Sequence, residues 1–201
     1  DYGISDSFSK MLKNPDFYYI LQELVDFGIV RYQENYSSRY QDTNLVLYKK
    51  YTYEDACRLL GWEHNEVPLN IGGYKYDRKT KTFPVFINYD KREDISDTTK
   101  YEDHFVSSSH LIAISKSGRT MESEDVQNFL KARERGIDVQ LFVRKNKDDK
   151  ISKEFYYLGR MTATGCAKEF VMPNTDKTAV EIEWVLDTPV REDIYEYIVN
   201  G

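Results

Sequence analysis

Residues whose types and spacing could do chemistry gather in the segment 71–77. Gly72 and Gly73 let the backbone turn sharply or approach a ligand closely. Tyr74 follows them directly, and Asp77 comes three residues later. An aromatic ring can stack on a nucleic-acid base, and a carboxylate can accept a hydrogen bond from the amino group of cytosine. The same spacing also suits a β-hairpin with a Gly-Gly turn, an exposed acid and core aromatics, so both interpretations stay open at this point.

A strand predicted over 83–89 follows this segment and could complete a base pocket. Its apolar residues alternate with the period of two that is typical of a strand: Phe83, Val85, Ile87 and Tyr89. A protein that inspects one base closely turns that base out of the helical stack and holds it in a pocket between flat side chains. One ring from this strand, together with Tyr74 and Asp77, would supply two walls and a hydrogen-bond acceptor.

The motifs of the common catalytic sites are absent from the sequence. It contains no GxxxxGK[ST] phosphate-binding loop, no HExxH, no GxSxG and no Asp…Glu-x-Lys pattern of a nuclease. The three histidines, His64, His104 and His110, lack metal-ligand spacing. We therefore expect a binding domain with no catalytic residues, no metal and no cofactor of its own.

The two cysteines and the chain start indicate the compartment. Cys57 lies in a helical pattern and Cys166 in a strand-like one, and no CxxC or Cys/His pair suggests zinc. We expect two buried thiols in a reducing, cytoplasmic environment. The start, without Met and without a basic segment before an apolar run, predicts no signal peptide and suggests a piece of a larger protein. No apolar run is long enough for a membrane span.

The charge is unevenly distributed along the chain. With 28 basic and 34 acidic residues the net charge is −6. Residues 67–168, however, contain 19 basic and 15 acidic side chains, a net charge of +4 between two acidic ends. This distribution is compatible with a local DNA-binding face, although a mixed, solvated surface would look much the same.

Periodicity and end signals indicate the elements that must position these residues. We expect one helix from Pro15 to Gly28, a polar loop over 34–42, a helix after Thr52 that stops at Gly61, and a helix from Ser123 to Gly136. Further strands are predicted over 111–114, 137–143, 155–158, 162–168 and 180–186. Short strands at this spacing favour a curved or closed sheet in the α+β class.

The segment from Gly72 to Asp77 resembles the base-pocket motif of SET-and-RING-associated (SRA) domains. The resemblance implies an SRA-like, PUA-like curved β-barrel with flanking helices. It also implies that Tyr74 is the first wall around a flipped 5-methylcytosine and that Asp77 reads the edge of the base. Counting residues favours Phe86 as the second wall, whereas residue type and strand face favour Tyr89.

A broader resemblance covers roughly residues 51–201. It includes Thr52–Leu60, Val85–Lys91, Leu141–Arg144, Phe155–Gly159 and Ile182–Leu186. These segments are similar to the C-terminal domain of ATP-dependent, SauUSI-type type IV restriction enzymes, which act on DNA with 5-methylcytosine or 5-hydroxymethylcytosine. The resemblance implies helicase and nuclease domains upstream in the same chain, with ATP and Mg²⁺ serving the motor. Residues 1–50 would then be a helical extension to that motor.

On this interpretation the partner is modified double-stranded DNA, held at its backbone by cations and small hydroxyls near the pocket. The residues assigned to these contacts are Arg78, Lys79, Lys81, Lys91, Arg92, Ser115, Lys116, Ser117 and Arg119. The stretch 115–120 could equally be an ordinary strand-to-helix loop. Three other functions remain open: a metal-dependent nuclease with a degenerate carboxylate site, a protein-interaction module of a helicase, and a reader of RNA or another modified base.

Overall fold

The structure is a computed structural model of residues 1–201, and it describes residues 3–64, 72–89, 102–145, 153–173 and 175–200. By their contacts the residues divide into two units, Asp1–Arg39 and Tyr40–Gly201. The sequence placed a boundary after residue 50. In the structure residues 40–50 are part of the second unit, where Tyr40, Leu45 and Val46 are buried.

The first unit consists of helices α1 (Asp6–Met11) and α2 (Pro15–Tyr36). Asn14 caps α2, since its Oδ1 accepts from the backbone N–H groups of the next turn, and proline follows at the first helical position as predicted. The prediction that Gly28 ends this helix is wrong. An interior glycine costs a helix only about 1 kcal/mol, and the helix continues for two further turns.

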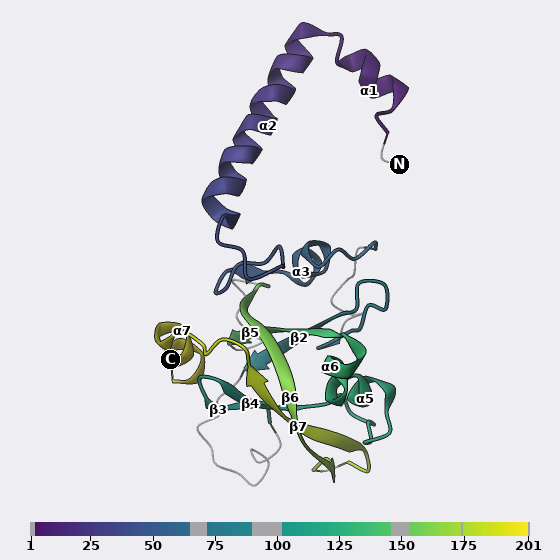
Figure 1. Cartoon of the computed structure of the whole chain (residues 1–201), viewed down its shortest axis with the longest axis vertical. Coiled ribbons are helices and arrows are strands. Elements are labelled where there is room, and N and C mark those ends of the chain that lie inside the picture. The colour runs from purple at the N-terminus through teal and green to yellow at the C-terminus, as the bar shows by residue number, and fades with distance from the viewer. Residues whose placement is uncertain (1–2, 65–71, 90–101, 146–152, 174, 201) are drawn as a thin grey trace. The chain divides into compact units, whose positions relative to one another are not determined.

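The second unit contains a seven-stranded mixed sheet whose main path runs β2-β5-β6-β7-β4-β3, with β1 paired to β6 (Figure 1). Strands β2 and β5 are parallel, and the other neighbours are antiparallel. The strands are β1 (Lys50–Tyr51), β2 (Thr82–Tyr89), β3 (His104–Ser107), β4 (His110–Ile114), β5 (Asp138–Lys145), β6 (Phe155–Val171) and β7 (Thr178–Leu186).

Strand β6 is where the sheet curves. It merges the two strands predicted over 155–158 and 162–168 into one element of 17 residues. Its pairing with β5 shifts register between Leu141 and Phe142, and its pairing with β7 shifts between Ala163 and Ala167. Such irregularities bend a strand and increase its twist.

Helices cover the sheet on both faces. Side chains of α5 (Glu124–Leu130), α6 (Ala132–Arg135) and α7 (Glu192–Val199) join the main core, which includes Phe83, Val85 and Trp184. Helix α3 (Tyr53–Leu59) packs on the other face, where Tyr53 contacts Phe86 and Phe155. The strand residues Phe83 and Phe86 therefore serve different cores.

Two predicted helix ends are informative. Thr52 caps α3, accepting from the backbone N–H of Asp55 at 3.1 Å, as its capping pattern predicts. Ser123 does not cap α5, because its Oγ accepts from the N–H of Thr120 instead. The single helix predicted up to Gly136 divides at Lys131 into α5 and α6, and Gly136 ends it in the left-handed conformation as expected.

The prediction of an α+β domain built on a curved sheet with flanking helices is confirmed. The sheet curls as a half-barrel with β2 and β3 at the ends of its path (Figure 1). Cys57 is buried as expected, but Cys166 is exposed, because it lies in the irregular part of β6 outside the core. Among the described helices, none is both long enough and apolar enough to cross a membrane.

Candidate functional site

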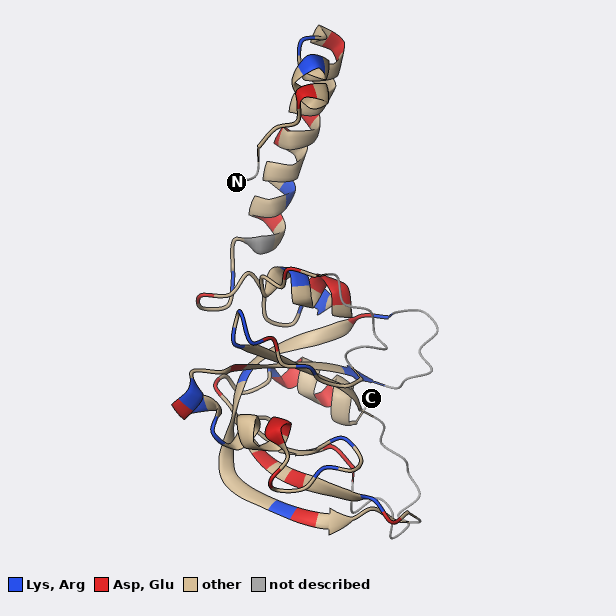
Figure 2. Ribbon diagram, turned by 90° about the vertical axis from the view of Figure 1, so that its right-hand side faces the viewer, with Lys and Arg blue, Asp and Glu red and all other residues tan. Residues whose placement is uncertain are grey.

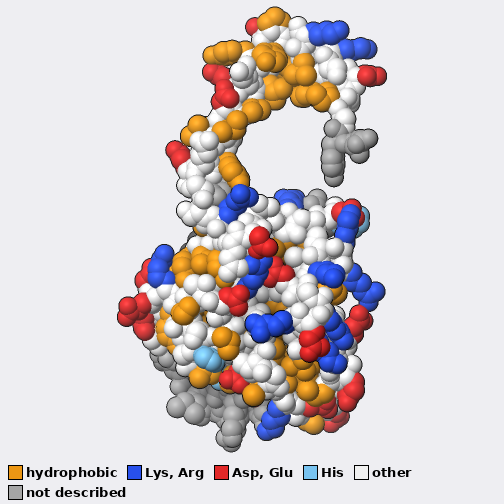
Figure 3. All heavy atoms as spheres, viewed as in Figure 1, with side chains coloured by type: hydrophobic (Ala, Val, Ile, Leu, Met, Phe, Trp, Pro, Cys, Tyr) orange, Lys and Arg blue, Asp and Glu red, His pale blue; other side chains and the backbone are white. Residues whose placement is uncertain are grey.

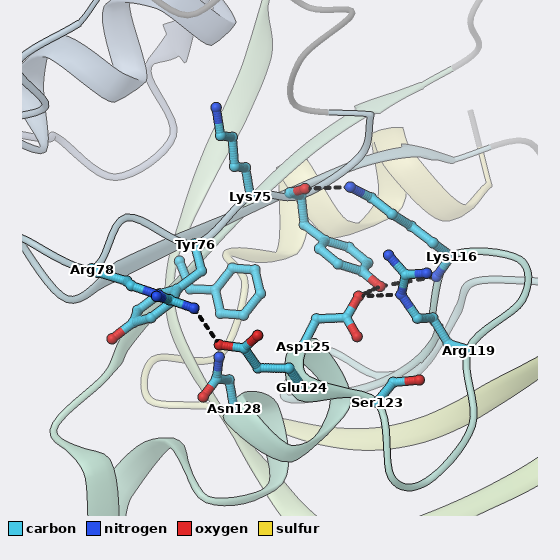
Figure 4. Close-up of a pocket in the computed structure, with 11 residues that line it drawn as sticks. Lys75, Tyr76, Arg78, Lys116, Arg119, Ser123, Glu124, Asp125 and Asn128 are labelled. Carbon is cyan, nitrogen blue, oxygen red and sulfur yellow. Dashed lines mark hydrogen bonds and ion pairs between the residues drawn. The ribbon is translucent and has the colours of Figure 1, made fainter.

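A pocket of about 450 Å³ opens between the segment around Tyr74, the loop after β4 and the start of α5 (Figure 4). Ligand pockets in proteins commonly have volumes of about 300–1,000 Å³. Three aromatic residues, four cations and four other polar residues line it: Tyr74, Tyr76 and Phe83; Lys75, Arg78, Lys116 and Arg119; Ser123, Glu124, Asp125 and Asn128.

Tyr74 lines this pocket and is held there by several contacts. Its hydroxyl donates to Asp125 Oδ2 at 2.9 Å and accepts from the backbone N–H of Lys116 at 3.0 Å. Its ring makes edge contacts with Phe83 and Phe129, with centroids 5.6 and 5.0 Å apart. Burial, with the negative charge of Asp125, raises the pKa of Tyr74 above its usual range, so the hydroxyl stays protonated and able to donate.

Asp125 is the carboxylate at the centre of the site. Its Oδ2 also accepts from Arg119 Nε at 2.7 Å. Burial alone would raise the pKa of Asp125, but hydrogen bonds from Arg119 and Tyr74 outweigh it and lower the pKa. Its Oδ1 accepts from Val126 N–H at 3.1 Å. Since a carboxylate oxygen has about two acceptor positions, Asp125 retains acceptor capacity.

Four cations line the pocket, and the two arginines among them pair with acids. Arg78 pairs with Glu124 at 2.7 Å on one side of the pocket, while Arg119 pairs with Asp125 on the other (Figure 4). The Arg78–Glu124 pair is exposed, and exposed pairs contribute only about 0–1 kcal/mol, so its arginine can change partner at little cost. Burial and the neighbouring charge of Arg119 lower the pKa of Lys116.

The structure brings part of the predicted site together. Tyr74, Arg78, Lys116 and Arg119 all line the pocket. Gly73 precedes them with φ +92°, and its carbonyl accepts from the N–H of Phe86 at 2.6 Å, which fixes this segment to β2. The positive φ at this position is one that glycine adopts without strain.

Asp77 faces away from Tyr74. Its Oδ2 accepts from the N–H and from the hydroxyl of Thr80, both at 2.8 Å, and so closes the turn that leads into β2. It lines a smaller pocket of about 50 Å³ together with Trp62 and Lys79. The side chains of Tyr74 and Asp77 therefore line different pockets.

Neither proposed second wall lines the pocket of Tyr74. Phe86 is buried on the opposite face of the sheet, stacked on Phe142 with centroids 4.7 Å apart. Tyr89 lies on the same face as Tyr74 but further along β2, where its ring packs against Phe105. The aromatic residues that line the pocket together with Tyr74 are Phe83 and Tyr76. The centroids of their two rings are 5.4 Å apart.

The other predicted backbone contacts are dispersed. Lys79 pairs with Glu63, and Lys81 is exposed with φ +54°. Ser115 is buried and its hydroxyl accepts from Val180 N–H, whereas Ser117 is exposed. Lys91 and Arg92 lie outside the described residues. Basic and acidic residues are interspersed along the ribbon of the second unit (Figure 2).

Sequence reasoning missed Tyr76, Asp125 and Asn128. The carboxylates at the start of α5 were visible, since Glu124 and Asp125 follow the loop that contains Arg119. Nothing local in the sequence connects them with Tyr74, which is 51 positions away. Over the described ranges, no group of three or more His, Cys, Asp or Glu side chains could hold a metal ion.

Comparisons with known proteins identify a family and a set of distant folds. Residues 45–198 match the family described as "Domain of unknown function (DUF3427)". No curated protein sequence matches the chain.

Solved structures that resemble this chain include SRA domains. The SUVH5 SRA domain in a complex with hemimethylated CG DNA is 12% identical, with 74% of this chain and 92% of that chain covered and a TM-score of 0.47. Arabidopsis thaliana SUVH6 in complex with SAM is 12% identical, with coverages of 78% and 30% and a TM-score of 0.49. KRYPTONITE in complex with mCHG DNA and SAH is 9% identical, with coverages of 83% and 38% and a TM-score of 0.49. At this distance, function has to be argued from the residues of this chain.

Proposed function

This chain belongs to the DUF3427 family, and we propose that its second unit binds duplex DNA and holds one modified cytosine, flipped out of the stack, in the pocket beside Tyr74. The observation that carries the proposal is the composition of this pocket. Aromatic rings, a carboxylate with acceptor capacity and a rim of cations meet in one cavity of about 450 Å³. Together these are the groups that a base on a phosphate backbone requires.

Each group has a part in this proposal. Tyr76, which is half-buried, offers flat apolar surface to the base and its methyl group, and the buried ring of Phe83 packs against it. Asp125 accepts from the exocyclic amino group of cytosine, and the amide of Asn128 can donate to the same edge. Arg78 and Lys75 lie beside them and can contact phosphate.

This assignment replaces two residues of the sequence-based hypothesis. Asp125 takes the role first given to Asp77, because Asp77 is occupied in a turn and lines another pocket. Tyr76 takes the role of the second wall in place of Phe86 and Tyr89, which lie outside the pocket. Tyr74 remains part of the site.

The parent protein is part of the same proposal. On the resemblance of residues 51–201, we place this domain at the C-terminal end of a SauUSI-type, ATP-dependent type IV restriction enzyme in the cytoplasm. Helicase and nuclease domains would precede it in the same chain, and residues 1–50 would connect it to the motor. ATP and Mg²⁺ would be needed by those domains only.

The test is a titration of the chain with two duplexes of one sequence, unmodified and with a single 5-methylcytosine, near physiological salt. We expect tighter binding of the modified duplex and no cleavage. The logarithm of the binding constant should fall linearly with the logarithm of the salt concentration, with a slope of about −3 to −6. Each phosphate contacted contributes roughly −0.9 to this slope. Equal affinities for the two duplexes would contradict the proposal.

The same experiment separates the other functions. Cleavage that requires added Mg²⁺ would indicate a nuclease site. Failure to bind either duplex even at low salt would favour a protein-interaction module. A preference for RNA of the same sequence would indicate a reader of a different nucleic acid.

A further inference from the structure

Lys116 covers the ring of Tyr74. Its ammonium lies 4.4 Å from the ring centroid and donates to the carbonyl oxygen of Tyr74 at 2.7 Å, while its backbone N–H donates to the hydroxyl of the same tyrosine (Figure 4). A cation over an aromatic face is attracted by the ring electrons. A base and this ammonium cannot occupy the same face of the ring.

The surroundings of Lys116 favour its departure once a phosphate is near. The ammonium donates to a neutral carbonyl, whereas a phosphate oxygen would accept the same hydrogen bond and add the attraction of a full negative charge. Burial and the charge of Arg119 both disfavour the ammonium where it lies, although Asp125 partly offsets them. A phosphate oxygen would supply the opposite charge.

Two glycines near Lys116 add no side chain that would hinder such a movement. A side chain at Gly72 would come within 3.7 Å of the ammonium, and glycine leaves that volume open. Gly118 follows with φ +80°, and a side chain there would meet nothing within 4 Å. The four-carbon stem of lysine can therefore turn without displacing neighbouring side chains at these two positions.

We propose that Lys116 is a displaceable cover on Tyr74, which leaves the ring when a base enters the pocket and then contacts a phosphate of the DNA backbone. This inference rests on the proposed function of the same pocket. The lysine opposes the entry of an isolated base and assists the entry of a base that arrives on a phosphate backbone. It thereby makes the pocket selective for a base within a polynucleotide over a free nucleoside.

The exchange can be observed directly by NMR of the full chain with lysine labelled at Cε. Ring currents from Tyr74 should shift the ε-methylene protons of Lys116 upfield, and loss of the signal in Lys116→Arg assigns it. At saturation with the 5-methylcytosine duplex the signal should move to the position of solvent-exposed lysines. With the unmodified duplex, held by phosphates alone, the upfield signal should persist.

The outcomes distinguish this inference from the function on which it rests. An upfield signal that persists at saturation with the modified duplex would overturn the role of Lys116 while leaving the function intact. Equal affinities for the two duplexes would contradict the proposed function and, with it, the role of Lys116 as a displaceable cover.

A variant provides an independent readout. Lys116→Met keeps much of the stem and removes the charge, and the exposed Lys153→Met serves as the control. The Lys116 variant should bind free 5-methyl-2′-deoxycytidine about two- to fivefold more tightly, the range expected from loss of a surface cation–π contact. It should also bind the modified duplex more weakly, with a salt slope smaller by about one. Weaker binding of both ligands would contradict the proposal.

Discussion

Asp125 and Asp77 both lie near the segment that contains Tyr74 and Tyr76, but their hydrogen bonds differ. Asp125 accepts from Tyr74 and Arg119 inside the pocket. Asp77 accepts twice from Thr80 in a turn. The amide oxygen of asparagine can replace a carboxylate oxygen in the turn, but an amide cannot accept at both ends from a bound base and its neighbours.

We therefore expect Asp125→Asn to remove most of the preference for modified DNA and Asp77→Asn to preserve it. The loss should be about 1–3 kcal/mol of discrimination, the usual contribution of a hydrogen-bonded base edge. The measurement is the ratio of affinities for the two duplexes in each variant, with melting temperatures to verify folding. Loss of discrimination in Asp77→Asn alone would restore the assignment made from sequence.

The same carboxylate predicts a pH dependence of stability. The folded pKa of Asp125 lies below its ordinary value of 3.8. The contribution of the charged form is therefore present above the unfolded pKa and is lost as pH falls through the folded pKa. The difference in melting temperature between the wild type and Asp125→Asn should be constant from roughly pH 5 to 7 and shrink below pH 4. A difference that grows on acidification would contradict the hydrogen bonding described.

Among the site residues, the sequence predicted those that a short motif marks. Tyr74 was recognised because the Gly-Gly turn precedes it, and Lys116 and Arg119 because they share a loop with small residues. Asp125 could not be found in the same way, because its link to Tyr74 exists only after β4 and α5 have packed against the segment before β2. The spacing of Asp77 also fits a local turn, and the structure shows that turn.

Among the elements, β6 determines how the sheet curves, and Gly159 lies at one of its irregular points. Gly159 has φ +96°, and a Cβ atom at this position would lie 3.2 Å from the side chain of Leu47 and 3.3 Å from that of Tyr40. Gly165 in the same strand has φ +94°, but a side chain there would meet nothing within 4 Å. The two glycines therefore form a matched pair that separates backbone strain from packing.

Gly165→Ala should cost about 1–2 kcal/mol for the left-handed backbone alone. Gly159→Ala should cost the same plus about 1–3 kcal/mol for overpacking against Tyr40 and Leu47. Urea unfolding of both variants measures the difference in free energy. Equal costs would mean that Tyr40 and Leu47 move aside freely and do not constrain the strand.

Element prediction succeeded where the signals were local and failed where packing decided. The cap at Thr52 and the end at Gly136 follow from side-chain and backbone chemistry within one turn. Gly28 resembles a helix end in the sequence, but the residues beyond it continue the helix. The continuity of β6 depends on its pairing with both β5 and β7, which alternation within one segment does not reveal.

At the scale of the molecule, the two units differ in how their apolar residues are covered. Helix α2 exposes many large apolar side chains, among them Leu24 and Phe27 at 62% and 63% (Figure 3). The second unit instead has a continuous core, and every residue lining the pocket belongs to it.

A chain that begins at Tyr40 should therefore fold and have the same affinity for the 5-methylcytosine duplex as the full chain. A chain that begins at residue 51 loses three buried side chains, Tyr40, Leu45 and Val46, at roughly 1.5–3 kcal/mol each, and should be markedly less stable. Thermal melting and duplex titration of both truncations test this. If the two truncated chains were equally stable, the domain boundary would lie after residue 50, as the sequence predicts.

The central claim is that the pocket lined by Tyr74 and Tyr76 receives the modified base. Tyr76 is the ring best suited to test it, because it is half-buried, whereas Tyr74 belongs to the core. Tyr53 is another half-buried tyrosine, on the other face of the sheet, and provides the control.

The decisive measurement is the ratio of dissociation constants for two duplexes that differ by one 5-methyl group, in the wild type, Tyr76→Ala and Tyr53→Ala. Loss of a stacking ring costs about 1–3 kcal/mol, so the ratio should fall by about five- to 150-fold or to unity in Tyr76→Ala. The Tyr53→Ala variant should retain the wild-type ratio. A wild-type ratio of one, or a ratio unchanged in folded Tyr76→Ala, would contradict the claim.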